Sequence, residues 1–438
     1  MNRRLFLFFG GVALAICAVP AWAGPFDKAE LRGTTDRDPV SYKANEKIVF
    51  TLAIAGAEVP AGYFVSWTLR GDDGSKKSGK EALTAEGLKV TASLAKPGFV
   101  YLRAQVEDAS GKVVKRDCNA PGENWFGLRD VIFTGGAGVE IDKIRQGKPE
   151  PKDFDKFWAK QKARLAKVPV KSVCEEVPSP KKEVKLYAVT VDCAGGRPVT
   201  GYLSVPRFCE KGGKCGAKVL FDGYGTGTPR PPKHIWDVWG MEFHVNAHGA
   251  DLGKNKAYYD EFFKSIKSNG KGYAFDPVQN ADPEKAYFNG MALRVMRALE
   301  YVKSRPEWNG KKLEVNGGSQ GGLQSMWGAA LDPQVTLADV MIIWCCDIGK
   351  SGEGRIKGTF EPQLTDALGY YDVVNHARRI KCKVNCSRAG LGDYTSPPSG
   401  IAAAYNNLAC PKSFNWTQGS DHGYIPPKPV IQMIQGGK

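Results

Sequence analysis

The chain has 438 residues, of which 42% are hydrophobic and 24% charged, and its formal net charge is +15. These values are ordinary for globular proteins, so they exclude a disordered chain, a collagen-like repeat and a small disulfide-stabilised scaffold. The length accommodates two or three domains, each with its own hydrophobic core. The basic residues are scattered among acidic ones, and no basic helix accompanies them, which argues against a nucleic-acid partner.

Residues 1–23 have the pattern of a secretory signal peptide rather than of a folded segment. Arg3 and Arg4 form a basic start, an apolar stretch runs from Leu5 to Val19, and residues 21–23 (Ala-Trp-Ala) form a small-x-small cleavage site. No later segment reaches the roughly 18 apolar residues that a membrane span needs. We therefore expect a secreted or periplasmic protein with no membrane partner once the signal peptide is removed.

Ten of the 11 cysteines remain after cleavage of residues 1–23, and an even number in an oxidising compartment predicts disulfides. Two pairs close in sequence are the expected bonds, Cys209–Cys215 and Cys174–Cys193, the second as a staple across a hairpin. A metal site is not expected, because the chain has no C-x-x-C pair and no histidines at ligand spacing.

Residues 24–140 show the pattern of an antiparallel β-sandwich. Short runs rich in β-branched and aromatic residues alternate with turn clusters such as Gly71-Asp-Asp-Gly74. Regular short strands of this kind are typical of an immunoglobulin-like sandwich, and no cluster of catalytic residue types falls within it. A structural spacer and a carbohydrate-binding module are both open for this region. The expected strands are Lys47–Ile54, Tyr63–Leu69, Leu88–Leu94 and Val100–Val106.

Residues 141–438 change to alternating strands and helices. Apolar residues recur at helical spacing from Phe154 to Leu165, and a further helix is expected from Leu323 to Leu331. Short β-rich runs between helices predict an α/β fold with a mainly parallel sheet covered on both faces. The expected strands are Val184–Val191, Val199–Val205, Ala217–Phe221, Lys312–Asn316, Asp339–Cys345, Lys383–Ala389 and Ser413–Thr417.

A candidate nucleophile follows one of these strands. Residues 317–321 read Gly-Gly-Ser-Gln-Gly, a G-x-S-x-G motif centred on Ser319, and they stand between an expected strand and an expected helix. That setting is the one a nucleophile elbow requires, because the tight turn admits only small neighbours and pushes the hydroxyl out of the sheet. The helix start also directs backbone N–H groups toward an oxyanion. The alternative is an ordinary glycine-rich turn.

A serine nucleophile needs a base, and an α/β-hydrolase carries its triad in the order serine, acid, histidine. Of the five histidines, only His376 and His422 follow Ser319. His376 precedes a strand, whereas His422 lies in a loop after the last expected strand, where the base belongs. Asp393, in the turn after the preceding strand, is the expected acid that orients the imidazole. Asp421 is the local alternative, but it is adjacent to His422 and badly placed to reach the ring.

The second donor of an oxyanion hole is expected in the loop after an earlier strand. The loop from Asp222 to Gly225 follows such a strand, so the backbone N–H of Tyr224 is the candidate, beside that of Gln320. The glycines of this loop do not form G-x-G-x-x-G, and no Gly-Lys-Ser/Thr follows. No cofactor is therefore expected.

Several segments within residues 141–438 resemble one family of esterases. The resemblance covers about residues 148 to 430, and it implies the same α/β-hydrolase fold. The segments that resemble the acetyl xylan esterase / cephalosporin C deacetylase family are Gly317–Gly322, Tyr371–Cys382, Ala404–Asn406, the entry Lys148–Trp158 and, most specifically, Gly390-Leu-Gly-Asp-Tyr-Thr-Ser-Pro-Pro-Ser399.

The resemblance implies a serine esterase that removes acetyl groups from xylan or xylo-oligosaccharides through an acyl-enzyme. It implies Ser319 as nucleophile, Asp393 as acid and His422 as base. It also implies Tyr224 and Gln320 as oxyanion donors, and all five assignments coincide with those made from the residues. The family forms closed oligomers, so a homo-oligomer is expected unless the added sandwich blocks that contact.

The chain departs from the family in three places. Between the oxyanion loop and the nucleophile the family usually carries Arg-Gly-Gln, where this chain has Val245-Asn-Ala-His-Gly-Ala-Asp251. The family's His-Glu is here His422-Gly423, and the sandwich before residue 140 is an addition. These departures leave the proton relay intact and bear on which alcohol is accepted.

Two other functions compete with the esterase. A prolyl-oligopeptidase-like serine peptidase also uses Gly-Gly-Ser-x-Gly-Gly, but such enzymes usually carry a propeller several times larger than this sandwich. The presence of all three triad residue types argues against a non-catalytic glycan-binding homologue. Trp236, Trp239 and Trp344 are candidates for sugar-stacking surfaces, although a tryptophan more often belongs to the core.

Overall fold

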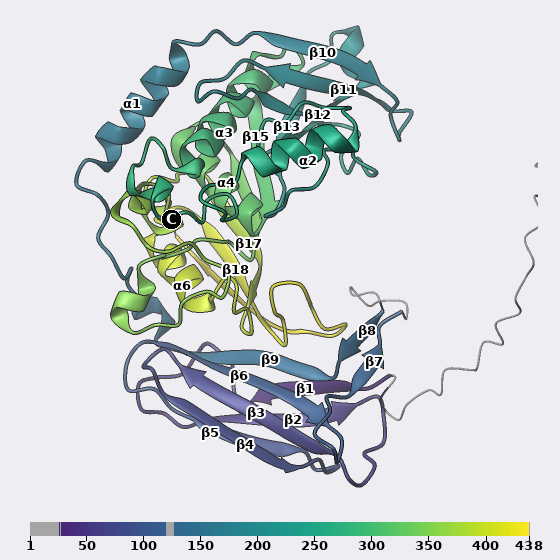
Figure 1. Cartoon of the computed structure of the whole chain (residues 1–438), viewed down its shortest axis with the longest axis vertical. Coiled ribbons are helices and arrows are strands. Elements are labelled where there is room, and N and C mark those ends of the chain that lie inside the picture. The colour runs from purple at the N-terminus through teal and green to yellow at the C-terminus, as the bar shows by residue number, and fades with distance from the viewer. Residues whose placement is uncertain (1–25, 27, 120–126, 438) are drawn as a thin grey trace, which may run out of the picture.

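The computed structural model describes residues 26, 28–119 and 127–437, so the expected signal peptide lies outside the described residues. Two bodies share one long interface: a small β-sandwich at the N-terminal end and a large α/β body that follows it (Figure 1). Within the described ranges, no helix combines the length and the apolar composition needed to cross a bilayer.

The sandwich pairs a three-stranded sheet, in the order β1-β2-β5, with a four-stranded sheet, in the order β4-β3-β6-β9, and every pairing is antiparallel. Buried residues alternate with partly exposed ones along β2 and with exposed ones along β5, as in strands that cover a core with one face. A short ribbon, β7-β8, extends from one end. The strands are β1 Glu30–Thr35, β2 Ile48–Ala55, β3 Phe64–Gly71, β4 Lys76–Ala82, β5 Leu88–Ala92, β6 Gly98–Glu107, β7 Lys115–Asp117, β8 Leu128–Asp130 and β9 Ile132–Val139.

The α/β body is built on a ten-stranded sheet with the order β10-β11-β12-β14-β13-β15-β16-β17-β18-β19. From β14 to β18 neighbouring strands are parallel, and the strands at both edges are antiparallel. The predicted α/β fold with a mainly parallel sheet is confirmed. The strands are β10 Ser172–Val177, β11 Val184–Val191, β12 Val199–Pro206, β13 Cys215–Phe221, β14 Met241–Asn246, β15 Trp308–Gly318, β16 Leu337–Met341, β17 Lys383–Gly390, β18 Lys412–Gln418 and β19 Val430–Gly436.

Helices connect and cover these strands. α3 and α4 pack against each other and against the central strands, and α1 packs on α3. The long apolar face of α3 lies in the main hydrophobic core, and the burial of this face stabilises the helix along its length. The helices are α1 Phe154–Ala166, α2 Lys256–Ser265, α3 Tyr287–Ser304, α4 Gln320–Leu331, α5 Val373–Ala377 and α6 Pro398–Asn407.

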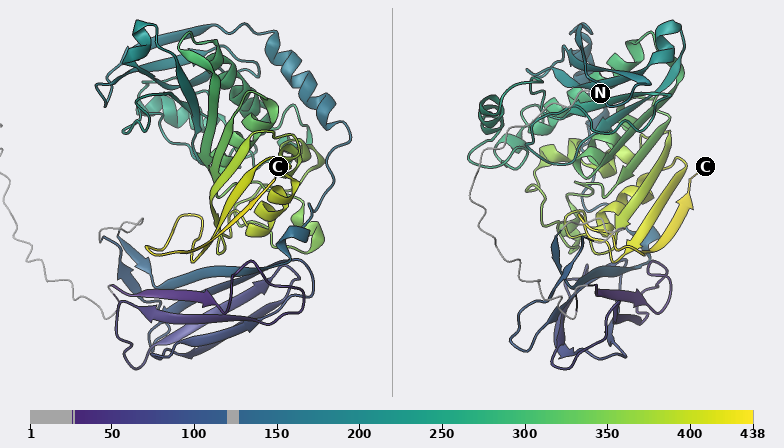
Figure 2. Two further views of the ribbon diagram at one scale, coloured as in Figure 1. Left: turned by 180° about the vertical axis from the view of Figure 1, so that it is seen from behind. Right: turned by 90° about the vertical axis from the view of Figure 1, so that its right-hand side faces the viewer.

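The sandwich rests against the C-terminal half of the large sheet, as the views from behind and from the side show (Figure 2). Phe99 on β6 contacts Trp416 on β18, with ring centroids 5.6 Å apart. The buried carboxylate of Asp72 accepts the backbone N–H of Phe99 and that of Ile356, each at 2.8 Å, so it joins the two bodies. We propose Glu140 as the domain boundary, because β9 ends at Val139 and all strands of the large sheet follow it.

The two predicted disulfides have different outcomes. All four cysteines are free thiols in the structure. Cys174 lies opposite Val189 in the β10–β11 pairing, whereas Cys193 lies two residues beyond the end of β11 at Val191. Four residues of extended chain span roughly 13 Å. Cys174 contacts the hydroxyl of Tyr301 instead. A Cys174–Cys193 bond therefore does not fit this register, because bonded cysteines need Cα atoms within about 7 Å.

The Cys209–Cys215 bond stays a prediction, since the two Sγ atoms lie 3.4 Å apart and both side chains are buried. In protein secreted through an oxidising compartment, peptide mapping under non-reducing conditions should recover the two cysteines as one linked peptide. Reduction should then lower the free energy of unfolding by about 2 kcal/mol, as expected for so short a loop. Two free thiols in the oxidised, secreted protein would contradict the bond.

Candidate active site

Ser319 stands at the sharp turn between β15 and α4. Its backbone takes φ 55° and ψ −119°, a conformation that costs on the order of 1–3 kcal/mol for a residue other than glycine. Two glycines make the turn possible. A Cβ at Gly317 would lie 2.5 Å from the carbonyl carbon of Gly321, and a Cβ at Gly321 would lie 2.0 Å from the Phe221 carbonyl oxygen. The strand–turn–helix setting expected for the G-x-S-x-G motif is therefore present.

The structure brings together the three residues expected to form a triad. His422 Nε2 lies 2.9 Å from Ser319 Oγ, and His422 Nδ1 lies 2.8 Å from Asp393 Oδ2. Asp393 is fully buried, and its other oxygen accepts the backbone N–H groups of Thr395 and Ser396 at 2.8 Å each. These residues follow β15, β17 and β18, parallel strands of the central sheet whose carboxyl ends lie at the same edge. One serine, one imidazole and one carboxylate thus form a continuous hydrogen-bonded chain.

His376 and Asp421, the alternatives for the base and the acid, do not join this hydrogen-bonded chain. His376 is buried in α5, where it packs edge-on against Phe154 and Trp158 of α1. Burial lowers the pKa of His376 to about 3, so this ring is a neutral part of the core. The carboxylate of Asp421 turns away from the His422 ring and accepts the backbone N–H groups of the two residues that follow the histidine.

The loop after β13 lies beside Ser319 because β13 and β15 are parallel neighbours, with Phe221 opposite Gly317. Tyr224 in this loop lines the same cleft as Ser319, and Gln320 is the first residue of α4. Both expected oxyanion donors are therefore near the serine. The ring of Tyr224 stacks on that of Tyr273, with centroids 4.1 Å apart and planes 9° apart.

The two segments expected to form the oxyanion hole are joined by one phenol. The hydroxyl of Tyr273 accepts the backbone N–H of Gly225 at 3.0 Å and donates to Gln320 Oε1 at 2.8 Å. His248 Nε2 lies 2.8 Å from the carbonyl oxygen of the same Gly225, so it must donate there, and Nδ1 then accepts from the Tyr287 hydroxyl. Burial lowers the pKa of His248 to about 4, which keeps the ring neutral for this role. The sequence marks His248 as part of a departure from the family and gives no sign of Tyr273.

Ser319 and His422 open into a cleft of about 880 Å³. The cleft has an apolar part, to which Ile342 and Phe360 contribute, and a cationic side chain, Arg388, which donates to the His422 carbonyl oxygen at 3.2 Å. Such a mixture of apolar walls and few polar groups is typical of small-molecule sites. In the part of the chain that the structure describes, no three His, Cys, Asp or Glu side chains are grouped to hold a metal ion.

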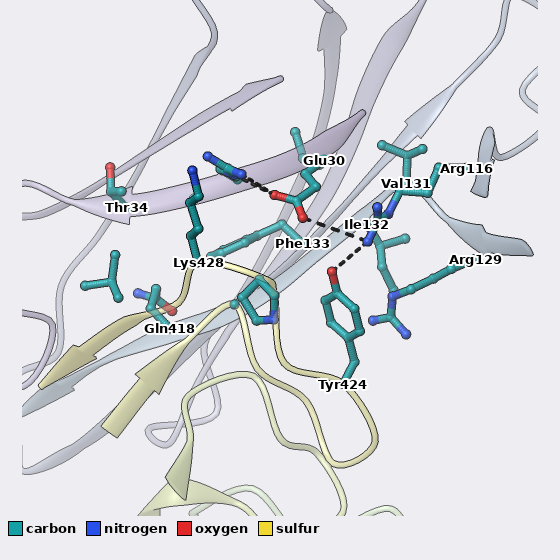
Figure 3. Close-up of a pocket in the computed structure, with 16 residues that line it drawn as sticks. Glu30, Thr34, Arg116, Arg129, Val131, Ile132, Phe133, Gln418, Tyr424 and Lys428 are labelled. Atoms are coloured by element: carbon teal, nitrogen blue, oxygen red, sulfur yellow. Dashed lines mark hydrogen bonds and ion pairs between the residues drawn. The ribbon is translucent and has the colours of Figure 1, made fainter. Parts of the chain in front are cut away.

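The sandwich holds the loop that carries His422, which we call the base loop and define as residues 419–428. Arg129 of β8 pairs with Asp421 at 2.8 Å, and its guanidinium lies 3.9 Å from the centroid of the Tyr424 ring. Arg116 of β7 donates to the Tyr424 hydroxyl at 2.7 Å. Figure 3 shows Arg116 and Arg129 beside Tyr424 at a cavity between the sandwich and the base loop. Residues some 300 positions apart in sequence therefore fix the backbone next to the imidazole.

We expect Arg129→Met to lower kcat for 4-nitrophenyl acetate about three- to tenfold and to change KM little, because a looser base loop misplaces His422 without altering the cleft. Asp421→Asn should have a similar effect. The Arg129→Met/Asp421→Asn double variant should lose no more kcat than either single variant. In a double-mutant cycle this corresponds to a coupling energy of about 1 kcal/mol between the two residues.

Arg32→Met is the matched control for Arg129→Met. Arg32 lines the same cavity but pairs with Glu30 on its own strand, so its loss should leave kcat unchanged. Additive effects of the Arg129 and Asp421 changes, or an equal loss in the Arg32 variant, would contradict a positioning role for the sandwich.

The strand order, the elbow and the hydrogen-bonded chain together define an α/β-hydrolase. A family model described as acetyl xylan esterase (AXE1) matches residues 139–351 and 357–434. The match covers well over half of the chain. The chain therefore belongs to the acetyl xylan esterase family, whose members are carboxylic ester hydrolases, and the resemblance seen in the sequence is confirmed.

Individual relatives agree with the family. The acetyl esterase Axe7A of Xylanibacter ruminicola is 26% identical over 415 residues, which cover 90% of this chain and 87% of that protein. An acetyl xylan esterase from Paenibacillus sp. R4 is 27% identical with a TM-score of 0.55, covering 66% of this chain and 94% of that one. Acetyl xylan esterase 1 from Thermoanaerobacterium sp. JW/SL YS485 shares the fold at 20% identity, with a TM-score of 0.53 and coverages of 65% and 92%. Because 90% of this chain is more than the residues from 139 onward can supply, the Axe7A alignment also takes in much of the sandwich.

Proposed function

We propose that this chain is a secreted or periplasmic serine esterase that removes acetyl groups from carbohydrate esters, with xylan or xylo-oligosaccharides as the substrate. The observation that carries the proposal is the hydrogen-bonded chain from Asp393 through His422 to Ser319, placed at an elbow and open to a cleft. The family supplies the acetyl ester as the bond to be cleaved. The proposed export of the protein is supported by the signal-peptide pattern of residues 1–23.

The geometry supports an acyl-enzyme mechanism. Ser319 Oγ attacks the acetyl carbonyl while His422 Nε2 takes its proton, and Asp393 stabilises the imidazolium that forms. The negative charge on the carbonyl oxygen is held by the backbone N–H groups of Tyr224 and Gln320. His422 then returns the proton to the departing sugar oxygen, which leaves the acetyl group on Ser319. Water, deprotonated by the same imidazole, releases acetate and regenerates the serine.

The peptidase alternative has less support. A propeller is absent from the described residues, and the sequence before the α/β body forms the small sandwich instead. The family match also favours an ester over a peptide bond. A panel of proline-containing peptides should accordingly show no cleavage under conditions in which 4-nitrophenyl acetate is hydrolysed.

The acyl preference tests the proposal. We expect kcat/KM to fall from acetyl through butyryl to octanoyl 4-nitrophenyl esters, and acetate to be released from acetylated xylan. Each extra methylene changes discrimination by only about 1–3 kcal/mol, so the trend over the series is the measurement that counts. A maximum at butyryl or longer would contradict the acetyl-esterase function while leaving the serine hydrolase intact.

A further inference from the structure

Two exposed tryptophans stand on one turn, and the first of them lines the cleft. Trp236 and Trp239 lie between β13 and β14, and 76% and 75% of their surfaces are exposed, whereas Trp344 is fully buried. We call this pair the tryptophan platform. Large aromatic side chains are normally placed in cores, so two exposed tryptophans three residues apart in the chain point to a surface that meets a ligand or partner.

The backbone of the platform is fixed by a buried carboxylate. Glu242 at the start of β14 is fully buried and accepts the backbone N–H of Trp236 at 3.1 Å and that of Asp237 at 3.0 Å. Asp237 in turn accepts the backbone N–H of Trp239 at 2.8 Å. Burying a carboxylate is costly unless it is well hydrogen-bonded, and here its bonds hold the turn that presents the two rings. The rings therefore sit on a preorganised turn.

One residue of the platform belongs to the wall of the cleft. Trp236 lines the same cleft as Ser319 and His422. Trp239 follows three residues later in the sequence and packs beside Phe208, with ring centroids 6.1 Å apart. One exposed ring thus lines the cleft that holds Ser319, and the second stands on the same turn three residues later, where the part of a substrate beyond the cleaved ester would lie.

We propose that the tryptophan platform is a binding subsite for the glycan chain, on which sugar rings next to the acetylated unit stack. A pyranose ring presents C–H groups on its faces and hydroxyl groups at its edge, so a flat ring in water matches its face and leaves its hydroxyls solvated. An acyl chain would instead need an enclosed apolar pocket. This inference rests on the proposed function, because it states which part of the carbohydrate substrate the esterase binds outside the cleaved ester.

The test compares a long and a short substrate. In Trp236→Ala, Trp239→Ala and the double variant, kcat/KM for acetylated xylotetraose should fall at least tenfold more than kcat/KM for 4-nitrophenyl acetate, mainly through a higher KM. Trp236→Phe should retain most of the preference, because it keeps a flat ring. Val173→Ala, equally exposed but on β10, is the control and should not change the ratio.

Binding separates this inference from the proposed function. Ser319→Ala protein should bind unacetylated xylohexaose, measured by calorimetry, and should lose that binding when both tryptophans are replaced. Equal losses on both substrates, or unchanged binding in the double variant, would overturn the platform even if acetylated xylan is a substrate. A dimer that dissociates in the double variant, with glycan kinetics unchanged, would assign the surface to a second copy of the chain. Binding without release of acetate from any glycan would keep the platform and reject the proposed reaction.

Discussion

Replacement of Ser319 by alanine is expected to lower kcat/KM for 4-nitrophenyl acetate by about 10⁴- to 10⁶-fold, and His422→Ala and the double variant should each lose about the same factor. The reason is that the 2.9 Å bond between the imidazole and the hydroxyl makes them one unit. Without the base the serine stays protonated, and without the serine the base has no nucleophile to activate. The measurement is the hydrolysis rate of the three purified variants at equal concentration.

Ser325→Ala is the matched control for Ser319→Ala. Ser325 lies in α4, is fully buried and makes no side-chain hydrogen bond, so its hydroxyl can be removed without loss of a partner. We expect kcat/KM of this variant to stay within about threefold of the unaltered protein. Near-normal activity of Ser319→Ala would show that another group is the nucleophile, and multiplicative losses in the double variant would show that Ser319 and His422 do not act as one unit.

Much of the fold could be predicted because many of its strands place apolar, β-branched or aromatic residues at their buried positions. β11 begins and ends where the sequence places it, and β12, β13, β17 and β18 differ by at most two residues at either end. The strands that were missed lie at sheet edges or carry polar residues: β4 reads Lys-Lys-Ser-Gly-Lys-Glu-Ala and is almost entirely exposed, and β10 is exposed along its length. Such strands are held by backbone pairing with a neighbour, which leaves no periodic apolar signal.

One predicted strand was too long for a local reason. The apolar run from Asp339 to Cys345 reads as a single strand, but β16 ends at Met341 because Ile342 takes φ 42°. At that point the chain leaves the sheet, and Ile342 lines the cleft beside Ser319. A β-branched residue with positive φ is strained, and hydrophobicity alone gives no sign of it.

The proposed triad could be placed from sequence because chain order and strand ends limit the choices, whereas its supports could not. Arg129 meets Asp421, and Tyr273 meets Gln320, only after strands far apart in the chain have packed together. No local sequence motif predicts such long-range contacts. His248 could be noticed only as an unusual residue where the family carries Arg-Gly-Gln, and its bond to Gly225 gives that departure a structural role.

Asp393→Asn is expected to lower kcat by about 10³- to 10⁴-fold without unfolding the protein. Asp393 Oδ1 accepts two backbone N–H groups, so the amide oxygen of asparagine must take that place and its NH₂ must face His422 Nδ1. The imidazole then accepts at Nδ1 and carries its proton on Nε2. In that tautomer it donates to Ser319 and has no lone pair with which to take the serine proton.

Asp421→Asn is the matched comparison, because Asp421 is the other aspartate near the base and loses the same charge. Its carboxylate supports the base loop and does not contact the imidazole, so its replacement should cost kcat no more than about tenfold. Circular dichroism and the unfolding midpoint should show that both variants are folded. If Asp421→Asn lost more activity than Asp393→Asn, the acid assigned here would be wrong, since only the group that fixes the tautomer of His422 can produce the larger loss.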